Sequence, residues 1–424
     1  MNLKKYYIGM PFLAVLAFSL ITSCSDINTN GDSRFTLDGY LIKDSTDTEY
    51  FAPKHPSNVK FYVEVSGSMN GFFRANRPTQ FKADLWQILS YYSSIAPSVY
   101  ILTNDGAQGV DMTQSQFQTK MNTGAFISTA STKVPLMIKS IISNLNADAG
   151  EVAVLVSDMK YSPVGAEAPE VLLTQYSTDI SKILGEYGKS VCLVCATSDY
   201  LNKSGQDIAD ERSPYYYFII GNSAQVAEMR NGISSLLEKR GHFVDNIESG
   251  FNYGKPKYSF GIPNKCEQLD DEPTFIAYED EEEGDTCTVK LKVHLENYRW
   301  LTSVEQVFAK AFQIKALYGS VVNVGNIKIE TQNITENEKE LKRQSTAIVE
   351  LKISKMATDS EVLEWTLELP DTDYTLFSEF IENSTNEDDP TKSYSVIDFI
   401  KGMFYGGVVN KKLEHNYILI SKKG

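Results

Sequence analysis

A buried strand that ends in oxygen-bearing side chains organises the N-terminal half of this chain. The stretch is Val59–Met69, VKFYVEVSGSM. Its apolar run predicts a core strand, and Glu64, Ser66 and Ser68 follow where that strand ends. In open α/β sheets, the loops that leave the carboxyl ends of the strands form the ligand crevice. Because hard divalent cations prefer carboxylate and hydroxyl oxygens, this loop is the first candidate for a ligand site.

Apolar runs and helical patterns alternate from residue 55 to residue 240. Near-continuous apolar runs at Val152–Val156 and Val191–Val194 predict central strands covered on both faces, and Tyr215–Ile220 predicts an edge or near-edge strand. Apolar residues at helical spacing separate these runs, and Pro135 suits the first turn of one such helix. Since alternating strands and helices are typical of βαβ units, we predict a doubly wound, mostly parallel, Rossmann-like α/β sheet.

Two further clusters of oxygen donors lie at positions where the predicted sheet would bring them together. Ser128-Thr129-Ala130-Ser131-Thr132 precedes a predicted helix, and Ser157-Asp158 directly follows the apolar run 152–156. Three loops at one edge of a sheet could therefore contribute oxygens to a single cation.

This combination resembles the metal-ion-dependent adhesion site of the von Willebrand factor type A (VWA) family, which combines a strand-end DxSxS, a distant Thr and a later strand-end Asp. The resemblance covers roughly residues 57 to 240, and the matching positions are Glu64, Ser66, Ser68, Thr132 and Asp158. Two positions depart from the family pattern: Glu64 replaces the first Asp, and Met159 stands where the family usually has Gly.

The resemblance implies a VWA-type fold and an incompletely coordinated divalent cation that accepts a carboxylate from a partner protein or other ligand. Mg²⁺ is the expected ion, with Ca²⁺ or Mn²⁺ as alternatives, because Glu64 is one methylene longer than Asp and could reach the ion, shift it or favour a looser geometry. In this interpretation Ser66, Ser68 and Thr132 supply hydroxyls, while Glu64 and Asp158 supply charge.

Two alternatives stay open. In the first, no metal binds: Ser66 and Ser68 cap the following turn, Glu64 bonds nearby amides, and the protein is an interaction scaffold of an envelope assembly. The second, a hydrolase, is the least favoured. A Ser-His-Asp site needs a histidine, and none of the four in the chain lies in the predicted crevice strands: His55, His242, His294 and His415. We therefore do not expect an enzyme.

Charge and length restrict the classes further. The chain has 424 residues and a formal net charge of -15, with 42% hydrophobic residues, which suits two globular domains or three. Nucleic-acid binding depends on clustered Lys and Arg, so this acidic chain is not expected to bind nucleic acid.

The N-terminus is typical of a bacterial lipoprotein. Lys4 and Lys5 precede the apolar stretch Tyr6–Ile21, and Ile21-Thr22-Ser23-Cys24 resembles a lipobox. We expect residues 1–23 to be a signal peptide, Cys24 to be lipid-modified, and residues 24–54 to be a flexible tether. A membrane-spanning helix is the alternative, but the apolar run is short for a span of about 20 residues. The expected location is the bacterial cell envelope, in the outer membrane, with the lipid as the contact to the bilayer.

The C-terminal half shows a different pattern. Residues 241–285 are predicted to be an acidic linker or insert, and residues 286–424 to be a β-rich domain with alternating apolar residues, as at Val289–Leu295. An immunoglobulin-like sandwich with helical additions near Val304–Leu317 and Val396–Phe404 is the predicted architecture. The acidic run 279–285 lacks the ligand spacing of an EF-hand loop and is interpreted as a solvated loop.

Cysteine usage allows one disulfide. Cys266 and Cys287 flank the acidic run and could pair in an oxidising compartment, a question that the sequence leaves open. Cys192 and Cys195 fall within one predicted strand, where their side chains would point to opposite faces. We therefore interpret them as core thiols and not as a redox or zinc pair.

Overall fold

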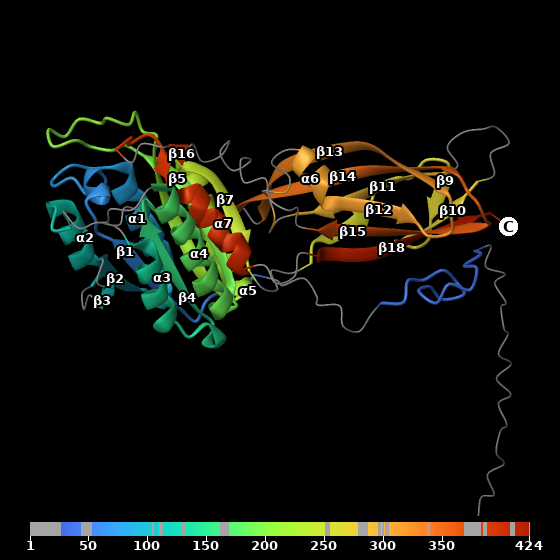
Figure 1. Cartoon of the computed structure of the whole chain (residues 1–424), viewed down its shortest axis with the longest axis horizontal. Coiled ribbons are helices and arrows are strands. Elements are labelled where there is room, and N and C mark those ends of the chain that lie inside the picture. Colours follow the sequence, from blue (N-terminus) through green and yellow to red (C-terminus); the bar gives the residue numbers. More distant parts are fainter. Residues whose placement is uncertain are drawn as a thin grey trace, which may run out of the picture.

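The computed structural model describes residues 27–43, 53–103, 106–109, 113–126, 128, 133–161, 169–250, 255–278, 287–295, 298, 301, 305–336, 340–368, 383–384, 388–407 and 412–423. The predicted signal peptide, Cys24 and the acidic run 279–285 lie outside these residues. An α/β unit and a β-rich unit follow each other along the long axis of the molecule (Figure 1). In the part of the chain that is described, no helix combines the length and the apolar character needed to cross a bilayer.

A seven-stranded sheet forms the centre of the α/β unit, in the order β3-β2-β1-β4-β6-β5-β7. Its strands are β1 (Asn58–Glu64), β2 (Ser98–Thr103), β3 (Gly106–Gly109), β4 (Glu151–Ser157), β5 (Ser190–Ser198), β6 (Ser213–Gly221) and β7 (Phe243–Ser249). Strand β1 pairs in parallel with β2 and with β4, whereas every other neighbouring pair in this sheet is antiparallel.

The prediction of a doubly wound, mostly parallel, VWA-type sheet is therefore wrong. Strand β6 lies between β4 and β5 and is antiparallel to both, although its sequence Tyr215–Ile220 predicts an edge or near-edge strand. All six of these residues are fully buried. A continuous apolar run indicates a strand that is buried on both faces. Helices that cover both faces of a sheet bury antiparallel strands as well as parallel ones, so such a run does not predict the direction of the strand.

Helices cover both faces of this sheet. Helices α3 (Val134–Ser143) and α4 (Pro169–Tyr187) lie together on one face with α7 (Val396–Gly407). On the other face, α1 (Gln80–Tyr91) packs against α2 (Gln114–Thr123) and α5 (Ser223–Arg240). The sheet is thus the middle of three layers, which explains why its central strands are apolar throughout.

Helix α7 comes from the C-terminal part of the chain and packs closely on α4. A Cβ atom at Gly402 would lie 2.7 Å from both the Cβ of Ile180 and the carbonyl oxygen of Ser177. The hydroxyl of Ser249 in β7 also donates to the carbonyl oxygen of Met403, at 3.0 Å. Residues within 286–424 therefore complete the α/β unit, and glycine in α7 allows the two helix backbones to approach.

We predict that Gly402→Ala destabilises the protein although Ala favours helix formation. The added methyl group overlaps α4, and such overpacking typically costs about 1–3 kcal/mol, against a gain of about 1 kcal/mol in helix propensity. Urea unfolding should show a net loss of up to about 2 kcal/mol. Tyr405→Ala, at a side chain that is 67% exposed on the same helix, is the control. An unchanged or higher stability of Gly402→Ala would contradict the close α4–α7 packing.

Two sheets form the β-rich unit. The five-stranded sheet has the order β12 (Phe312–Ala316), β15 (Ser360–Glu368), β18 (Lys412–Lys422), β10 (Thr274–Ala277) and β9 (Cys266–Gln268). The four-stranded sheet has the order β13 (Val321–Glu336), β14 (Glu340–Lys355), β11 (Cys287–His294) and β8 (Lys257–Phe260). Helix α6 (Glu305–Ala311) precedes β12, and β16 (Asn383–Ser384) forms a short parallel pair with β17 (Ser393–Tyr394).

This arrangement corrects the prediction of an immunoglobulin-like sandwich of antiparallel strands. The larger sheet is mixed, because β10 pairs with β18 in parallel. Strands β8, β9 and β10 also come from residues 241–285, the segment predicted to be a linker or insert. Their short and interrupted apolar runs carry little periodic signal, so only long-range pairing reveals them as strands.

Aromatic contacts and a disulfide join the two sheets. Trp365 of the larger sheet packs edge-on against Tyr258 of the smaller one, with 5.3 Å between ring centroids. Cys266 of β9 and Cys287 of β11 form a disulfide, which answers the question left open by the sequence. Cys192 and Cys195 are buried thiols that form no disulfide, which agrees with their interpretation as core residues. One continuous cluster of buried apolar residues extends through both units, so they share a core.

Candidate metal centre

The register of two central strands creates the floor of the candidate site. Strands β1 and β4 pair in parallel with Val63 opposite Val156, so the next residues, Glu64 and Ser157, lie side by side at the carboxyl edge. The hydroxyl of Ser157 donates to Oε2 of Glu64 and accepts the backbone N–H of Met159 at 2.7 Å. Glu64 is fully buried, so this hydrogen bond holds its carboxyl group in place at the start of the site.

The two hydroxyls of the first loop lie next to each other. Oγ of Ser66 and Oγ of Ser68 are 2.9 Å apart, which is a hydrogen bond in which either can donate. Ser66 is 1% exposed, whereas Ser68 is partly exposed and begins the 3-10 turn Ser68–Gly71. The loop therefore presents one hydroxyl to the interior and one toward the surface.

Asp158 carries the least satisfied group of the site. Asp158 is 3% exposed, and its Oδ1 accepts a hydrogen bond from the backbone N–H of Lys160 at 3.2 Å. Among the described residues, no hydrogen-bond partner of normal geometry reaches its buried Oδ2. Burial raises the pKa of this carboxyl, although the charge of Lys160 and the nearby side chain of Ser68 lower it in part. A cation at Oδ2 would relieve this desolvation.

Met159 adopts an unusual backbone conformation at the position where the VWA family usually has Gly. Its φ is 57°, in the left-handed region that glycine enters at little cost. Met159 is fully buried, and its N–H is held by Ser157. The sharp turn after β4 therefore has the left-handed backbone geometry that is typical of glycine, although the residue is Met159. Burial of the Met159 side chain and the hydrogen bond from its N–H hold this conformation.

Thr132, the remaining predicted ligand, lies outside the described residues. Ser128, the first residue of the same oxygen cluster, is held by two hydrogen bonds to Asn70. The side-chain amide of Asn70 donates to the Ser128 carbonyl at 2.7 Å and accepts its N–H at 2.8 Å. The structure thus brings Glu64, Ser66, Ser68 and Asp158 together, and it brings the start of the second oxygen cluster to the same loop.

Several supporting residues gave no signal in the sequence. The hydroxyl of Tyr200, just after β5, donates to the Ser68 carbonyl at 2.9 Å, and its ring lies so close to Gly71 that no Cβ atom fits there. The guanidinium of Arg74 donates to the Leu201 carbonyl at 3.0 Å. These contacts join loops about 130 residues apart, so no local pattern could predict them.

The C-terminal part of the chain supports the loop that carries Asp158. The N–H of Tyr161 donates to Oγ of Ser395 at 3.0 Å, and the hydroxyls of Tyr216 and Ser393 form a buried hydrogen bond. The ring of Tyr161 also stacks on Tyr176 of α4, with centroids 4.2 Å apart. The segment that precedes α7 therefore fixes one side of the candidate site.

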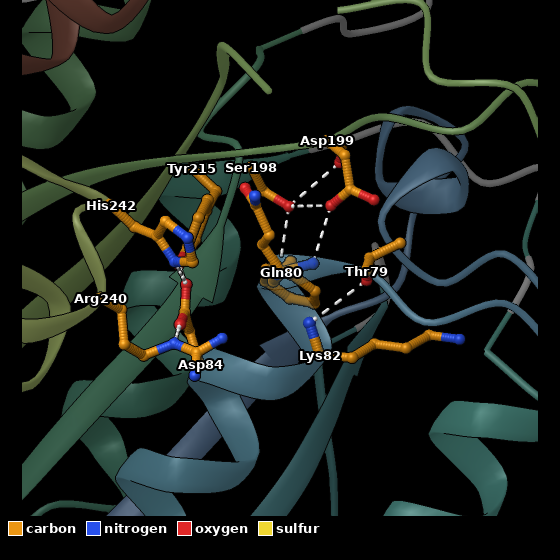
Figure 2. A network of polar contacts seen from close by, with 10 residues as sticks. Thr79, Gln80, Lys82, Asp84, Ser198, Asp199, Tyr215, Arg240 and His242 are labelled. Atoms are coloured by element: carbon orange, nitrogen blue, oxygen red, sulfur yellow. Dashed lines mark hydrogen bonds and ion pairs between the residues drawn. The ribbon is translucent and has the colours of Figure 1, made fainter. Parts of the chain in front are cut away.

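Figure 2 shows how the helix that follows the first loop is fixed at its N-terminus. Oδ1 of Asp199 accepts the N–H of Gln80 at 2.7 Å, and Oγ of Ser198 accepts the N–H of Phe81 at 2.9 Å. A carboxylate is favourable there because the first N–H groups of a helix carry partial positive charge. Lys82 Nζ donates to the carbonyl of Arg74 at 2.7 Å, and burial lowers the pKa of Lys82 to about 8 although Asp199 opposes this effect.

The same view contains a buried carboxylate with three partners. Asp84 of α1 accepts from the hydroxyl of Tyr215 at 2.7 Å and from Nε of Arg240, and its Oδ2 lies 2.7 Å from Nδ1 of His242. From the sequence, His242 is not expected in the strands that form the crevice. The cluster ties α1 to β6 and to the end of α5, so it stabilises the framework around the site.

The donor set fits a hard cation in kind. Hydroxyls of Ser66 and Ser68 and the carboxyls of Glu64 and Asp158 are all oxygen ligands, which suit Mg²⁺ or Ca²⁺. Within the described ranges there is no group of three or more His, Cys, Asp or Glu side chains placed to hold a metal ion, so any ion here would depend on hydroxyls and water. Comparisons with protein-family models, with curated proteins and with solved structures gave no match.

We predict that Asp158 makes stability depend on pH when divalent cations are chelated. A raised carboxyl pKa means that, above the ordinary carboxyl range, the folded state holds a proton that the unfolded state has released. The free energy of unfolding therefore decreases as the pH rises through that window. Asp158→Asn removes the charge. The free energy of unfolding of this variant should therefore exceed that of the wild type at neutral pH by about 1–3 kcal/mol.

Urea unfolding of both proteins in chelator across a pH series tests this prediction. The two stabilities should converge at acidic pH, where Asp158 is neutral in both states, which provides the internal control. A difference that stays constant across the series would show that Asp158 does not titrate with a raised pKa.

Proposed function

We propose that this is a lipid-anchored envelope protein that binds a protein or another carboxylate-bearing ligand through a divalent cation at the edge of the α/β sheet. The observation that carries the proposal is Oδ2 of Asp158, a buried carboxylate oxygen that no described residue satisfies with a hydrogen bond, beside the Ser66–Ser68 hydroxyl pair. A buried anion without a partner is costly, and a cation offsets that cost.

Four residues of this chain would bind the ion, and a fifth would contribute negative charge. Ser66, Ser68 and Asp158 would bind the ion, with Thr132 as the further hydroxyl that the VWA resemblance implies. Glu64 accepts a hydrogen bond from Ser157, so it would act through its negative charge or after release of that bond. Mg²⁺ is the preferred ion because it keeps several waters, with Ca²⁺ or Mn²⁺ as alternatives.

Few anionic ligands around the ion would leave it electrophilic. When bound, the cation supplies an open coordination position that a carboxylate of the ligand can occupy in place of water. Gly67, Ser68 and Asn70 are partly exposed residues of the first loop, so the ligand would approach from their side. The resemblance to the VWA adhesion site supports this set of oxygen ligands. The resemblance is limited to the site, because the strand order and directions of the sheet are not those of a mostly parallel, VWA-type sheet.

A metal-free scaffold is the second candidate, and a specific observation favours it. Ser157 already satisfies one oxygen of Glu64, and Ser66 and Ser68 satisfy each other. In that case Asp158 carries a proton and the loops form a binding surface without an ion. A hydrolase remains the least favoured class.

Cation titration separates the two candidates. We predict that Mg²⁺, Mn²⁺ or Ca²⁺ stabilises the wild type by about 2.7 kcal/mol when the free ion is a hundred times its Kd. Ser68→Ala and Asp158→Asn should remove that stabilisation, and Ser204→Ala, at an exposed hydroxyl in the loop after β5, should retain it. Thermal melts provide the measurement, and a wild-type melt that none of the three ions moves would favour the metal-free scaffold.

Ligand capture tests the second half of the proposal. The mature protein without its lipid is immobilised and exposed to envelope extract, with and without chelator. Partners that depend on the ion should be lost on chelation and should also be lost from the Ser68→Ala protein. Partners retained equally in all cases would place binding elsewhere on the molecule.

A further inference from the structure

The residues that follow the lipobox are fastened to the β-rich unit. The sequence predicts a flexible tether over residues 24–54, yet residues 27–43, here called the N-terminal strap, pack on the five-stranded sheet. Phe35 is 4% exposed and packs against Val362 of β15 and Leu419 of β18. Thr274 of β10 donates its hydroxyl to the carbonyl of Gly39 at 2.5 Å.

A polar clamp also holds the strap. Nε of Arg34 donates to Oδ1 of Asp32 at 2.8 Å, and the hydroxyl of Tyr318 donates to Oδ2 of Asp32. The Arg34 guanidinium lies 4.6 Å from the ring centroid of Tyr417, in cation–π geometry. The hydrogen bond from Arg34 holds the pKa of Asp32 well below its usual range, with Tyr318 adding to the effect. Buried apolar and charged contacts together make the strap a built attachment.

The strap begins at the end of the molecule that is farthest from the α/β unit. The N–H of Asn28 donates to Oγ of Ser421, next to the end of β18, at 2.8 Å. In Figure 1 the strap, drawn in blue, lies beside β10, β18 and the C-terminus, while the α/β unit occupies the other end of the long axis. Strand β13 has 16 residues, which at about 3.3 Å per residue span roughly 50 Å of this axis.

The two units are joined firmly. Their buried apolar residues form one continuous cluster, and α7 returns from the β-rich part of the chain to pack on α4. The direction in which the β-rich unit points therefore fixes where the candidate metal centre lies.

We propose that the strap makes the β-rich unit a pedestal: it fixes the lipid anchor at the free end of that unit and holds the α/β sheet edge away from the bilayer. Only two residues, Ser25 and Asp26, separate Cys24 from Ile27, so at most about 11 Å of extended chain lies between the acyl groups and the docked strap. The partner of this end is the lipid bilayer. The inference rests on the proposed lipidation of Cys24 and is independent of cation binding.

Energy transfer from two positions to the membrane tests the pedestal. The lipidated protein is reconstituted in phosphatidylethanolamine–phosphatidylglycerol vesicles that carry an acceptor dye on the headgroups. Donor dyes are attached at Ala357→Cys, in the exposed turn between β14 and β15, or at Lys203→Cys, in the exposed loop after β5. The native thiols Cys192 and Cys195 are buried and Cys266 is paired with Cys287, so the introduced cysteines are the ones labelled.

Transfer from position 357 should exceed transfer from position 203 several-fold. Equal transfer, or greater transfer from position 203, would overturn the proposal. Cys24→Ser should abolish binding to the vesicles, and retained binding would also overturn it, because the anchor would then lie elsewhere. The cation response of the same samples, read by thermal melts, reports separately on the metal centre.

A matched pair of strap variants tests the docking itself. Phe35→Ser removes the buried apolar contact, whereas Leu37→Ser changes a side chain on the same strap that is 80% exposed. Undocking lengthens the free tether to about 30 residues, with a reach of roughly 30 Å, so the molecule can tilt and the two transfer efficiencies should approach each other. Leu37→Ser should retain the wild-type ratio. A Phe35→Ser protein that keeps its cation response and an unchanged ratio would overturn the role of the strap.

Discussion

The parallel pairing of β1 with β4 is the constraint on which the candidate site depends. Both strands are buried on both faces, so their register is fixed by packing as well as by backbone hydrogen bonds. That register sets Glu64 beside Ser157 and carries Asp158 to the Ser66–Ser68 loop. A slip of one residue would turn the site residues to the opposite faces of the sheet, so the position of every donor follows from this one pairing.

Segments remote in sequence then hold the loops that leave these strands. Tyr200 bonds the Ser68 carbonyl, Asn70 bonds Ser128, and Ser395 bonds the N–H of Tyr161. The left-handed turn at Met159 and the buried carboxyl of Asp158 are each unfavourable in free energy, and the hydrogen bonds from these remote segments hold them in place. Costs of this kind persist where surrounding contacts over-determine the geometry, which is typical of ligand sites.

The path of the chain links the two units into one body. The N-terminal strap packs on the β-rich unit, and the chain then builds the seven strands of the α/β sheet. After most of the β-rich strands the chain returns as α7 to cover α4, and β18 follows in the β-rich unit. The β-rich unit is thus connected to the α/β unit by several crossings and a shared core. Such a connection suits a rigid support better than a mobile second domain.

Periodicity in the sequence determined where the main strands and helices of the α/β unit lie, and the oxygen donors at the ends of Val59–Val63 and Val152–Val156 marked the sheet edge where Glu64, Ser66, Ser68 and Asp158 meet. Burial pattern is a local property, so it is visible in the chain itself. Strand direction and order are not: β6 has the apolar run of a buried strand, and only its pairing shows that it is antiparallel and central. The positions of α7 and the strap, and the partners Tyr200, Asn70 and Ser395, were likewise decided by tertiary structure, because they depend on contacts between residues dozens to hundreds of positions apart.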